Sequence, residues 1–285
     1  AKQAQMDMFE DYFYSYNNWI NRENGRTSGT GYANITKGLV EVIDGFSTQV
    51  FLAQNISNTF SLPNDFYLIN KLFYYSTPLF TGTATTVLAN SLVDFNAVGW
   101  NTIPASSPTP KIGSLIVNTT TLKQAYVTGV VSTTQITLSD NIFNVIGESY
   151  IIYSNTNIRE VERVSQNKIF LLTNSMLTAP TKTYPAYVLG GNIVTIYPST
   201  ILNAGDIQAQ YVRYPLSPRW TYLNLGLGEP QFDPTQSDFQ EFELPDSDEP
   251  TLIAKICQYV GIEIREADVY NFGATEEGND TQETS

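Results

Sequence analysis

The sequence has no histidine, one cysteine and few charged residues, and each shortage excludes a class of function. Without histidine the chain cannot build a Ser-His-Asp or Cys-His relay, an imidazole metal site or a histidine pH switch. One cysteine excludes an internal disulfide and a thiolate zinc cage. No apolar run approaches the ~18 residues that a membrane-spanning helix needs, so we expect no membrane partner.

The acidic residues gather at the C-terminal end. The chain carries 28 Asp and Glu against 15 Lys and Arg, a net charge of −13. Residues 1–228 hold 13 acids and 13 bases, so residues 229–285, with 15 acids and two bases, carry the whole excess. Binding to nucleic acid needs clustered Lys and Arg, which this chain lacks. The sequence therefore predicts a neutral body with an acidic C-terminal arm.

Threonine and asparagine take the place of the missing charges. The chain holds 32 Thr and 24 Asn, and aromatic residues make up 13% of it. β-Branched and aromatic side chains favour strands, and asparagine favours turns. This mixture is typical of an extended, β-rich structural or binding protein rather than of a cytosolic metabolic enzyme.

Apolar residues recur at helical spacing near both ends of the chain. Met6 and Phe9 begin one helical face, and a second, shorter helix ends at Asp44-Gly45, so residues 1–45 are predicted to be helical. The acidic C-terminal arm, residues 223–285, is predicted to hold one helix. Ser247-Asp248 caps this helix at about 249–260, Gly261 ends it, and residues 274–285 are predicted to be disordered.

Strand patterns fill the middle of the chain. Phe66–Tyr75 is apolar on both faces, which predicts a central strand covered on both sides. Gly190-Gly191 is predicted to be the two-residue loop of a hairpin. An outer β domain, residues 46–79 and 156–222, is predicted to include strands at Glu160–Val164, Lys168–Leu172, Ala186–Leu189, Asn192–Tyr197 and Asp206–Tyr214, and Phe239–Leu244 would add an edge strand.

Residues 80–155 differ from the rest by their short, Thr-, Val- and Ile-rich strands separated by turns. These strands are predicted at Ser114–Asn118, Ala125–Val131, Gln135–Leu138 and Glu148–Tyr153. We predict a small β-barrel of about five strands inserted in a loop of the outer domain. The predicted fold class is mainly β with helices at both ends (α+β). The predicted body is an antiparallel β-sandwich or a barrel-like sheet. It carries the small inserted β-barrel, with N-terminal helices before it and a C-terminal helix after it.

Few residues suggest chemistry. Glu160 and Glu162 share a strand face, and paired carboxylates about 5–10 Å apart can hydrolyse glycosides. Arg159 and Arg163 flank them, however, as on an ordinary solvated strand. Cys257 falls on the apolar face of the C-terminal helix, as a buried small hydrophobe does. Four acids of the arm match no calcium-loop spacing: Asp233, Asp238, Asp246 and Asp248. We predict no enzyme and no catalytic, cofactor-binding or metal-binding residue.

A series of short segments resembles a known family. In chain order these are EVERV (160–164), LTAPT (177–181), YPAY (184–187), IVTIYP (193–198), QYVRYP (210–215), PRW (218–220) and FELP (242–245). The series resembles virion structural proteins of crAss-like bacteriophages that form head-to-tail ring or connector layers. It covers most of residues 46–79 and 156–265. Segments between residues 113 and 143 resemble a small β-barrel module of phage tail and connector proteins.

The resemblance implies a structural role in the virion, with assembly in the bacterial host cytoplasm. Identical copies would close into a ring in the neck between portal and tail, a dodecamer that matches the portal, and would extend the DNA conduit without sequence-specific binding. The implied partners are further copies of the chain, the portal protein and adjacent neck or tail ring proteins. The resemblance brings no catalytic role and no cofactor.

A proline- and aromatic-rich strap, residues 214–222, is the predicted subunit contact, because exposed Trp and Tyr are typical anchors. The alternative is that the strap packs within its own copy. The predicted interface residues are Tyr214, Trp220, Tyr222, Phe242 and Leu244. Like charges repel over about 8 Å at physiological salt. We therefore expect residues 229–285 to splay outward or to run along a neighbouring subunit that has basic residues, away from the DNA channel.

Two other functions stay open. A phage tail fibre or receptor-binding protein that binds glycans would need β-helical repeats or an exposed Trp/Tyr groove. A carbohydrate-active hydrolase that uses carboxylates alone would need two of them facing each other in a concave pocket.

Overall fold

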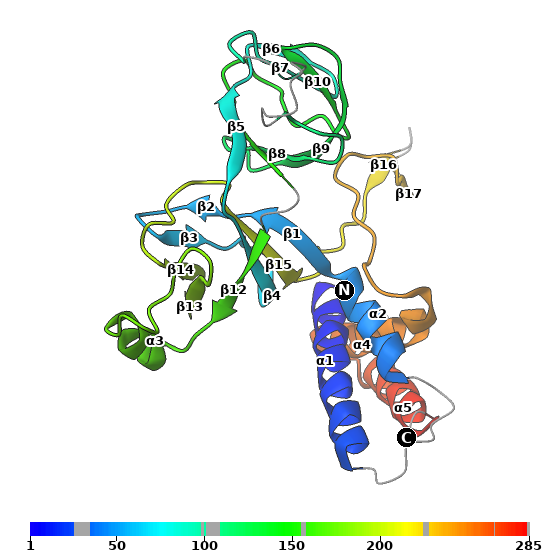
Figure 1. Cartoon of the computed structure of the whole chain (residues 1–285). Helices are drawn as coiled ribbons and strands as arrows, with labels where there is room; N and C mark the ends of the chain where they lie inside the picture. The colour runs from blue at the N-terminus through cyan, green and yellow to red at the C-terminus, as the bar shows by residue number, and fades with distance from the viewer. Residues whose placement is uncertain are drawn as a thin grey trace. The chain divides into compact units, whose positions relative to one another are not determined.

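Most predicted strands and helices are present in the computed structural model, which describes residues 1–25, 35–97, 100, 109–154, 158–224, 228–264 and 266–283 (Figure 1). The fold is mixed, about 27% helix and 34% strand. It has helices at both ends and a nearly closed, barrel-like sheet, so the predicted fold class is confirmed. The chain divides into a helical unit, Ala1–Ser47 with Arg213–Ser285, and a β unit, Thr48–Val212.

The helical unit contains the predicted N-terminal helices and two C-terminal ones. Its elements are α1 (Lys2–Gly25), α2 (Ile35–Gly45), β16 (Tyr222–Asn224), β17 (Pro230–Phe232), the 3-10 helix η1 (Asp246–Asp248), α4 (Glu249–Ile264) and α5 (Ala267–Glu283). The apolar face of α1 forms its core, since Ala4 and Met8 pack against Leu252 of α4. Phe9 is fully buried and makes an edge contact with Phe46, with ring centroids 5.1 Å apart.

Polar contacts also join α1 to the C-terminal helices. Tyr12 Oη donates a hydrogen bond to Asp248, and burial together with this carboxylate raises the pKa of Tyr12. Lys255 Nζ of α4 lies 3.2 Å from Asp11 Oδ2 of α1. Residues 236 and 244 positions apart in sequence are therefore held in one helical assembly.

The C-terminal region departs from the prediction. Gly261 lies inside α4 instead of ending it. A Cβ there would come within 2.6 Å of the backbone nitrogen of Tyr270 in α5, so this glycine allows two helices to approach closely. A Cβ at Gly273 would meet Ala254 O at 2.6 Å in the same way. The prediction of disorder at 274–285 is wrong as far as the described end of α5, because this helix packs along α4.

The predicted edge strand at Phe239–Leu244 is also wrong. Within the described residues, this segment pairs only through one bridge between Gln240 and Arg219. Phe242 and Leu244 pack on the α1–α4 core instead. The alternation of apolar residues here reflects contact with helices rather than with a sheet.

The larger sheet has eight strands in the order β1-β15-β4-β12-β13-β14-β3-β2. These are β1 (Ser47–Phe51), β2 (Ala53–Gln54), β3 (Thr59–Ser61), β4 (Phe66–Tyr75), β12 (Ile158–Arg163), β13 (Ala186–Gly190), β14 (Ile193–Tyr197) and β15 (Ile207–Arg213). β4 is central, as predicted. Tyr74 and Tyr75 are both buried, whereas Asn70 and Lys71 are exposed. Both faces of β4 are therefore covered only over its second half.

A short helix, α3 (Gln166–Thr173), replaces the predicted strand Lys168–Leu172. Ile169 is its buried residue and packs with Val164 and Val188 on the sheet. The partly buried Leu172 packs against the same cluster, and its spacing of three from Ile169 is helical. The run is too short for this period to be told from that of a buried strand, which explains the wrong prediction. The hairpin after it is shifted by one position, since Gly190 pairs with Ile193 and the loop is Gly191-Asn192.

The insertion is a seven-stranded, nearly closed sheet in the order β5-β11-β8-β9-β10-β7-β6. Its strands are β5 (Pro78–Thr83), β6 (Thr86–Leu88), β7 (Ser91–Val93), β8 (Leu115–Asn118), β9 (Gln124–Val130), β10 (Gln135–Leu138) and β11 (Ser149–Tyr153). All four strands predicted there are confirmed within a residue or two. Its core is separate and includes Leu92, Ile116, Phe143 and Ile152. The insertion can therefore bury its own apolar surface.

A buried polar cluster joins the insertion to the larger sheet. Tyr153 Oη of β11, which has one proton to donate, lies 2.8 Å from the acceptor Asp206 Oδ1 and 3.0 Å from the acceptor Gly205 O. Gln208 Nε2 of β15 donates to Gln124 Oε1 of β9 at 2.7 Å. Burial raises the pKa of both Tyr153 and Asp206. These bonds fix the barrel on its parent sheet through side chains as well as through the chain crossings.

Candidate subunit interface

An exposed aromatic surface lies in the helical unit at β16 and β17. Trp220, Tyr222 and Phe232 are 59%, 51% and 47% exposed. Trp220 stacks on Tyr222 with ring centroids 5.3 Å apart and on Phe232 with centroids 6.2 Å apart. Tyr222 and Phe232 are also cross-strand partners. We call these three residues the aromatic ribbon.

An ordered scaffold holds the aromatic ribbon. Thr221 Oγ1 donates to Asp233 O at 2.6 Å, and Asp233 N donates to Thr221 O at 3.1 Å. Hydrogen bonds from Thr235 and then Gln236 lower the pKa of the Asp233 carboxyl, so its charge supports this turn. Rings presented on a fixed backbone lose little conformational freedom on binding, which favours association.

The five predicted interface residues separate into two groups. Trp220 and Tyr222 lie together on the surface. The others pack within the helical unit: the ring of Tyr214 lies 6.0 Å from that of Phe9, and Phe242 and Leu244 adjoin the α1–α4 core. Phe232 is not among the predicted residues, because only the pairing of β17 with β16 brings it beside Trp220.

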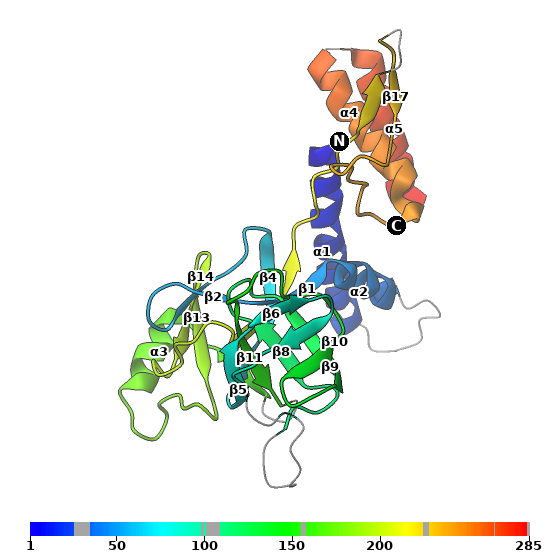
Figure 2. The same ribbon diagram turned by 90° about the horizontal axis from the view of Figure 1, so that it is seen from above.

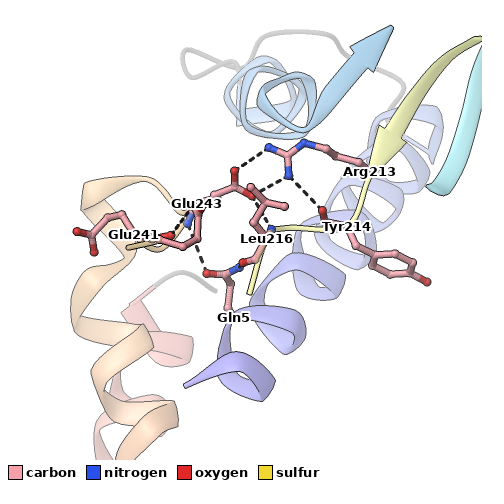
Figure 3. A network of polar contacts seen from close by, with 7 residues as sticks. Gln5, Arg213, Tyr214, Leu216, Glu241 and Glu243 are labelled. Atoms are coloured by element: carbon pink, nitrogen blue, oxygen red, sulfur yellow. Dashed lines mark hydrogen bonds and ion pairs between the residues drawn. The ribbon is translucent and has the colours of Figure 1, made fainter. Parts of the chain in front are cut away.

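Glu243 holds the base of the strap in place (Figure 3). Arg213 donates to both carboxylate oxygens of Glu243, at 2.7 and 2.8 Å, and the backbone N–H of Leu216 donates to it at 2.7 Å. Arg213 lowers the pKa of Glu243. Gln5, which is almost fully buried, donates to Leu216 O at 2.8 Å and accepts from Glu243 N at 3.4 Å. The network ties the strap to α1.

A cavity of about 400 Å³ opens beside this network, between α2 and the Arg213–Glu243 pair. Gly38, Val42 and Phe46 line it together with the Arg213–Glu243 pair. These two charged groups bind each other bidentately, so neither of them is left to bind a ligand in the cavity.

The predicted catalytic candidates lie on the β unit. Glu160 and Glu162 line a shallow cavity of about 370 Å³. They stand side by side along β12 rather than across the cavity, and both are exposed. Glu160 Oε1 lies 3.2 Å from Lys71 Nζ. This arrangement is that of a charged strand surface, not of two carboxylates facing each other across a bound sugar.

The residues that the structure describes offer no metal site, since they contain no group of three or more His, Cys, Asp or Glu residues that could hold a metal ion. Cys257 is free and half-buried in α4, less enclosed than predicted. In the part of the chain that the structure describes, no helix is long and apolar enough to cross a membrane. No family model matches the chain, and no curated protein matches it significantly.

Proposed function

We propose that this protein is a virion structural subunit that assembles head to tail into a ring, in the neck between the portal and the tail of a tailed bacteriophage. The observation that carries the proposal is the aromatic ribbon: three large apolar rings, exposed and pre-stacked on an ordered scaffold. Trp and Tyr dominate the energetics of protein interfaces. The series of segments that resembles connector proteins supports the assignment to the neck.

The distribution of charge between the two units also supports a head-to-tail contact. The β unit holds seven acids and seven bases, whereas the helical unit holds 21 acids and eight bases. The helical units of two copies would repel each other, so a symmetric contact between them is disfavoured. A head-to-tail contact joins two different surfaces, and its repetition by rotation closes a ring. In the neck, such a ring would surround DNA without base-specific contacts.

Light scattering and negative-stain electron microscopy on the purified full-length chain test this proposal. We expect closed rings whose population rises with protein concentration. The double variant Trp220→Ala/Tyr222→Ala should shift the mass toward the monomer, because it removes the apolar anchors. Tyr14→Ala is the matched control, since Tyr14 is an exposed aromatic residue of the same unit outside the ribbon. A wild-type chain that stays monomeric at every concentration, alone and with a portal ring, refutes the proposal.

A second function is favoured by the same rings. Exposed Trp and Tyr faces also stack on sugars, so the aromatic ribbon fits a glycan-binding protein of a phage tail fibre. Titration with bacterial surface oligosaccharides separates the two functions. Saturable binding that Trp220→Ala abolishes, in a protein whose mass does not change, would favour the glycan binder over the ring subunit.

A further inference from the structure

A second apolar surface lies on α3 and the loop that follows it, beside β13 and β14 in the β unit (Figures 1 and 2). Phe170 and Leu171 are exposed on the helix. Met176 and Leu177 are almost completely exposed in the loop, and Tyr184 is largely so. We call these five residues the α3 tip. Soluble monomers rarely leave so many large apolar side chains in water within one short segment.

Folding of the β unit does not account for the α3 tip. One side of α3 is buried, where Ile169 packs with Val164, Ala186 and Val188. The tip residues are not part of that cluster. Their exposure therefore represents apolar area that association with another surface would remove from water.

The segment that carries the α3 tip has a net positive charge in a chain that is strongly acidic overall. Residues 164–205 contain Lys168 and Lys182 and no acid. Asp206 is the first acid after this stretch. Burial raises the pKa of its carboxyl, and the positive charge of Lys182 lowers it by a smaller amount because it favours the charged form. A partner that covers the tip should therefore combine apolar side chains with an acidic rim.

The α4–α5 pair of the helical unit has that combination. Ile253, Val260 and Ile264 are exposed on α4 at spacings of seven and four, which aligns them on one stripe of the helix. Glu263 lies next to this stripe and is exposed. On α5, exposed Phe272 and Glu276 are four residues apart and share a face.

We propose that the α3 tip of one copy docks on the α4–α5 pair of a second copy. The inference rests on the proposed ring, to which it adds a pair of contacting surfaces besides the aromatic ribbon. Complementary charge identifies the partner surface. The segment that carries the tip is basic, the α4–α5 pair belongs to the unit that carries all of the excess negative charge, and both surfaces expose apolar side chains. Neither surface complements itself, so the contact is head to tail.

Charge reversal on the two surfaces tests this docking. One variant is Lys168→Glu/Lys182→Glu in the segment that carries the tip. The other is Glu263→Lys/Glu276→Lys in the α4–α5 pair. Each should weaken self-association about tenfold or more, since like charges then meet across the contact. An equal mixture of the two variants should recover assembly, because the reversed tip meets the reversed helices and the two unchanged surfaces still pair.

Two further variants leave the net charge unchanged and so separate the contribution of apolar burial to association from that of charge. Met176→Ser/Leu177→Ser should also weaken association, while Ile112→Ser, an exposed apolar residue of the same unit outside the tip, should not. Circular dichroism of each variant checks that the fold is unchanged.

The outcomes distinguish this docking from the ring itself. A wild-type chain that assembles, with variants that assemble equally well, overturns the docking and leaves the ring intact. Weakened variants that do not recover on mixing also overturn it. A wild-type chain that never assembles overturns the ring and the docking together. A photo-crosslinker at Leu177 supports the docking if it captures α4–α5 peptides of an isotopically distinct copy.

Discussion

Glu243→Gln is the most direct test of how the helical unit holds its strap. The Glu243 carboxylate accepts two hydrogen bonds from Arg213 and one from the Leu216 backbone (Figure 3). The substitution keeps the shape of the side chain but removes the charge. It also places an amide N–H₂ where an oxygen accepts, so that one of the Arg213 or Leu216 donors faces another donor.

The size of the effect follows from burial. The side chains of Arg213 and Glu243 are each 21% exposed, so this ion pair is better shielded than a surface pair. Hydrogen bonds to a charged group contribute about 1.5–3 kcal/mol each, and those of one carboxylate are not additive. We expect Glu243→Gln to lower the free energy of unfolding by about 2–3 kcal/mol, which moves a urea midpoint by roughly 1 M.

The effect should depend on pH in a defined direction. Because Arg213 lowers the pKa of Glu243 in the folded state, the stabilisation is complete above the unfolded pKa, about 4.3. It is lost as the pH falls through the lower, folded pKa. The difference between the wild type and Glu243→Gln should therefore be constant near neutral pH and shrink below about pH 4.

Urea unfolding followed by circular dichroism at neutral and acidic pH measures this. Glu241→Gln is the control, because Glu241 is exposed and lies two residues away in sequence, and its substitution changes the net charge by the same amount. The reasoning is refuted if the two variants have the same midpoint, or if the Glu243→Gln deficit grows on acidification.

Two further predictions concern packing at glycines of the helical unit, and a third concerns a hydrogen bond of the β unit. Gly261→Ala should destabilise the α4–α5 pair by about 1–3 kcal/mol, since its Cβ would lie 2.6 Å from Tyr270 N. Gly38→Ala in α2, where nothing lies within 4 Å of the added Cβ, should instead stabilise the helix by up to about 1 kcal/mol; thermal denaturation compares the two. Tyr153→Phe should lower the free energy of unfolding by about 1–3 kcal/mol, because the buried Asp206 then loses the Tyr153 donor and keeps Asn203; urea unfolding measures it.

Controls make these outcomes decisive. A Gly261→Ala protein as stable as the wild type would show that α5 does not pack closely on α4 at this point. Tyr126→Phe, at an exposed position of the inserted barrel, should leave stability unchanged. If Tyr153→Phe behaves in the same way as Tyr126→Phe, the bond to Asp206 does not stabilise the junction.

Local patterns were sufficient wherever burial is periodic along one segment. The spacing of Met6 and Phe9 predicts α1, and the alternation within residues 114–153 predicts four strands of the inserted barrel. The prediction fails where one element depends on another. The apolar run Lys168–Leu172 predicts a strand, but it forms a helix that packs on the sheet through Ile169 and the partly buried Leu172. Residues 274–283 are polar, and their helix forms against α4.

The candidate interface shows the same division. Trp220 and Tyr222 were identified from residue type, but Phe232 joins them only through the pairing of β17 with β16. The α3 tip is not predicted from the sequence. A strand at Lys168–Leu172 would bury every second side chain there, and residue type alone does not mark Met176, Leu177 and Tyr184 as exposed.

By itself the sequence determined the composition-level properties of this protein. These are the absence of histidine chemistry, the concentration of the −13 charge in residues 229–285, and the β-rich body with helical ends. Each depends on residue type or on spacing along one segment. Only the tertiary structure decided which apolar side chains are covered. It places Phe242 and Leu244 in a core while leaving Trp220 and Leu177 exposed. The reason is physical: exposure depends on what other segments cover, and hydrophobicity is the same for a buried and for an exposed leucine.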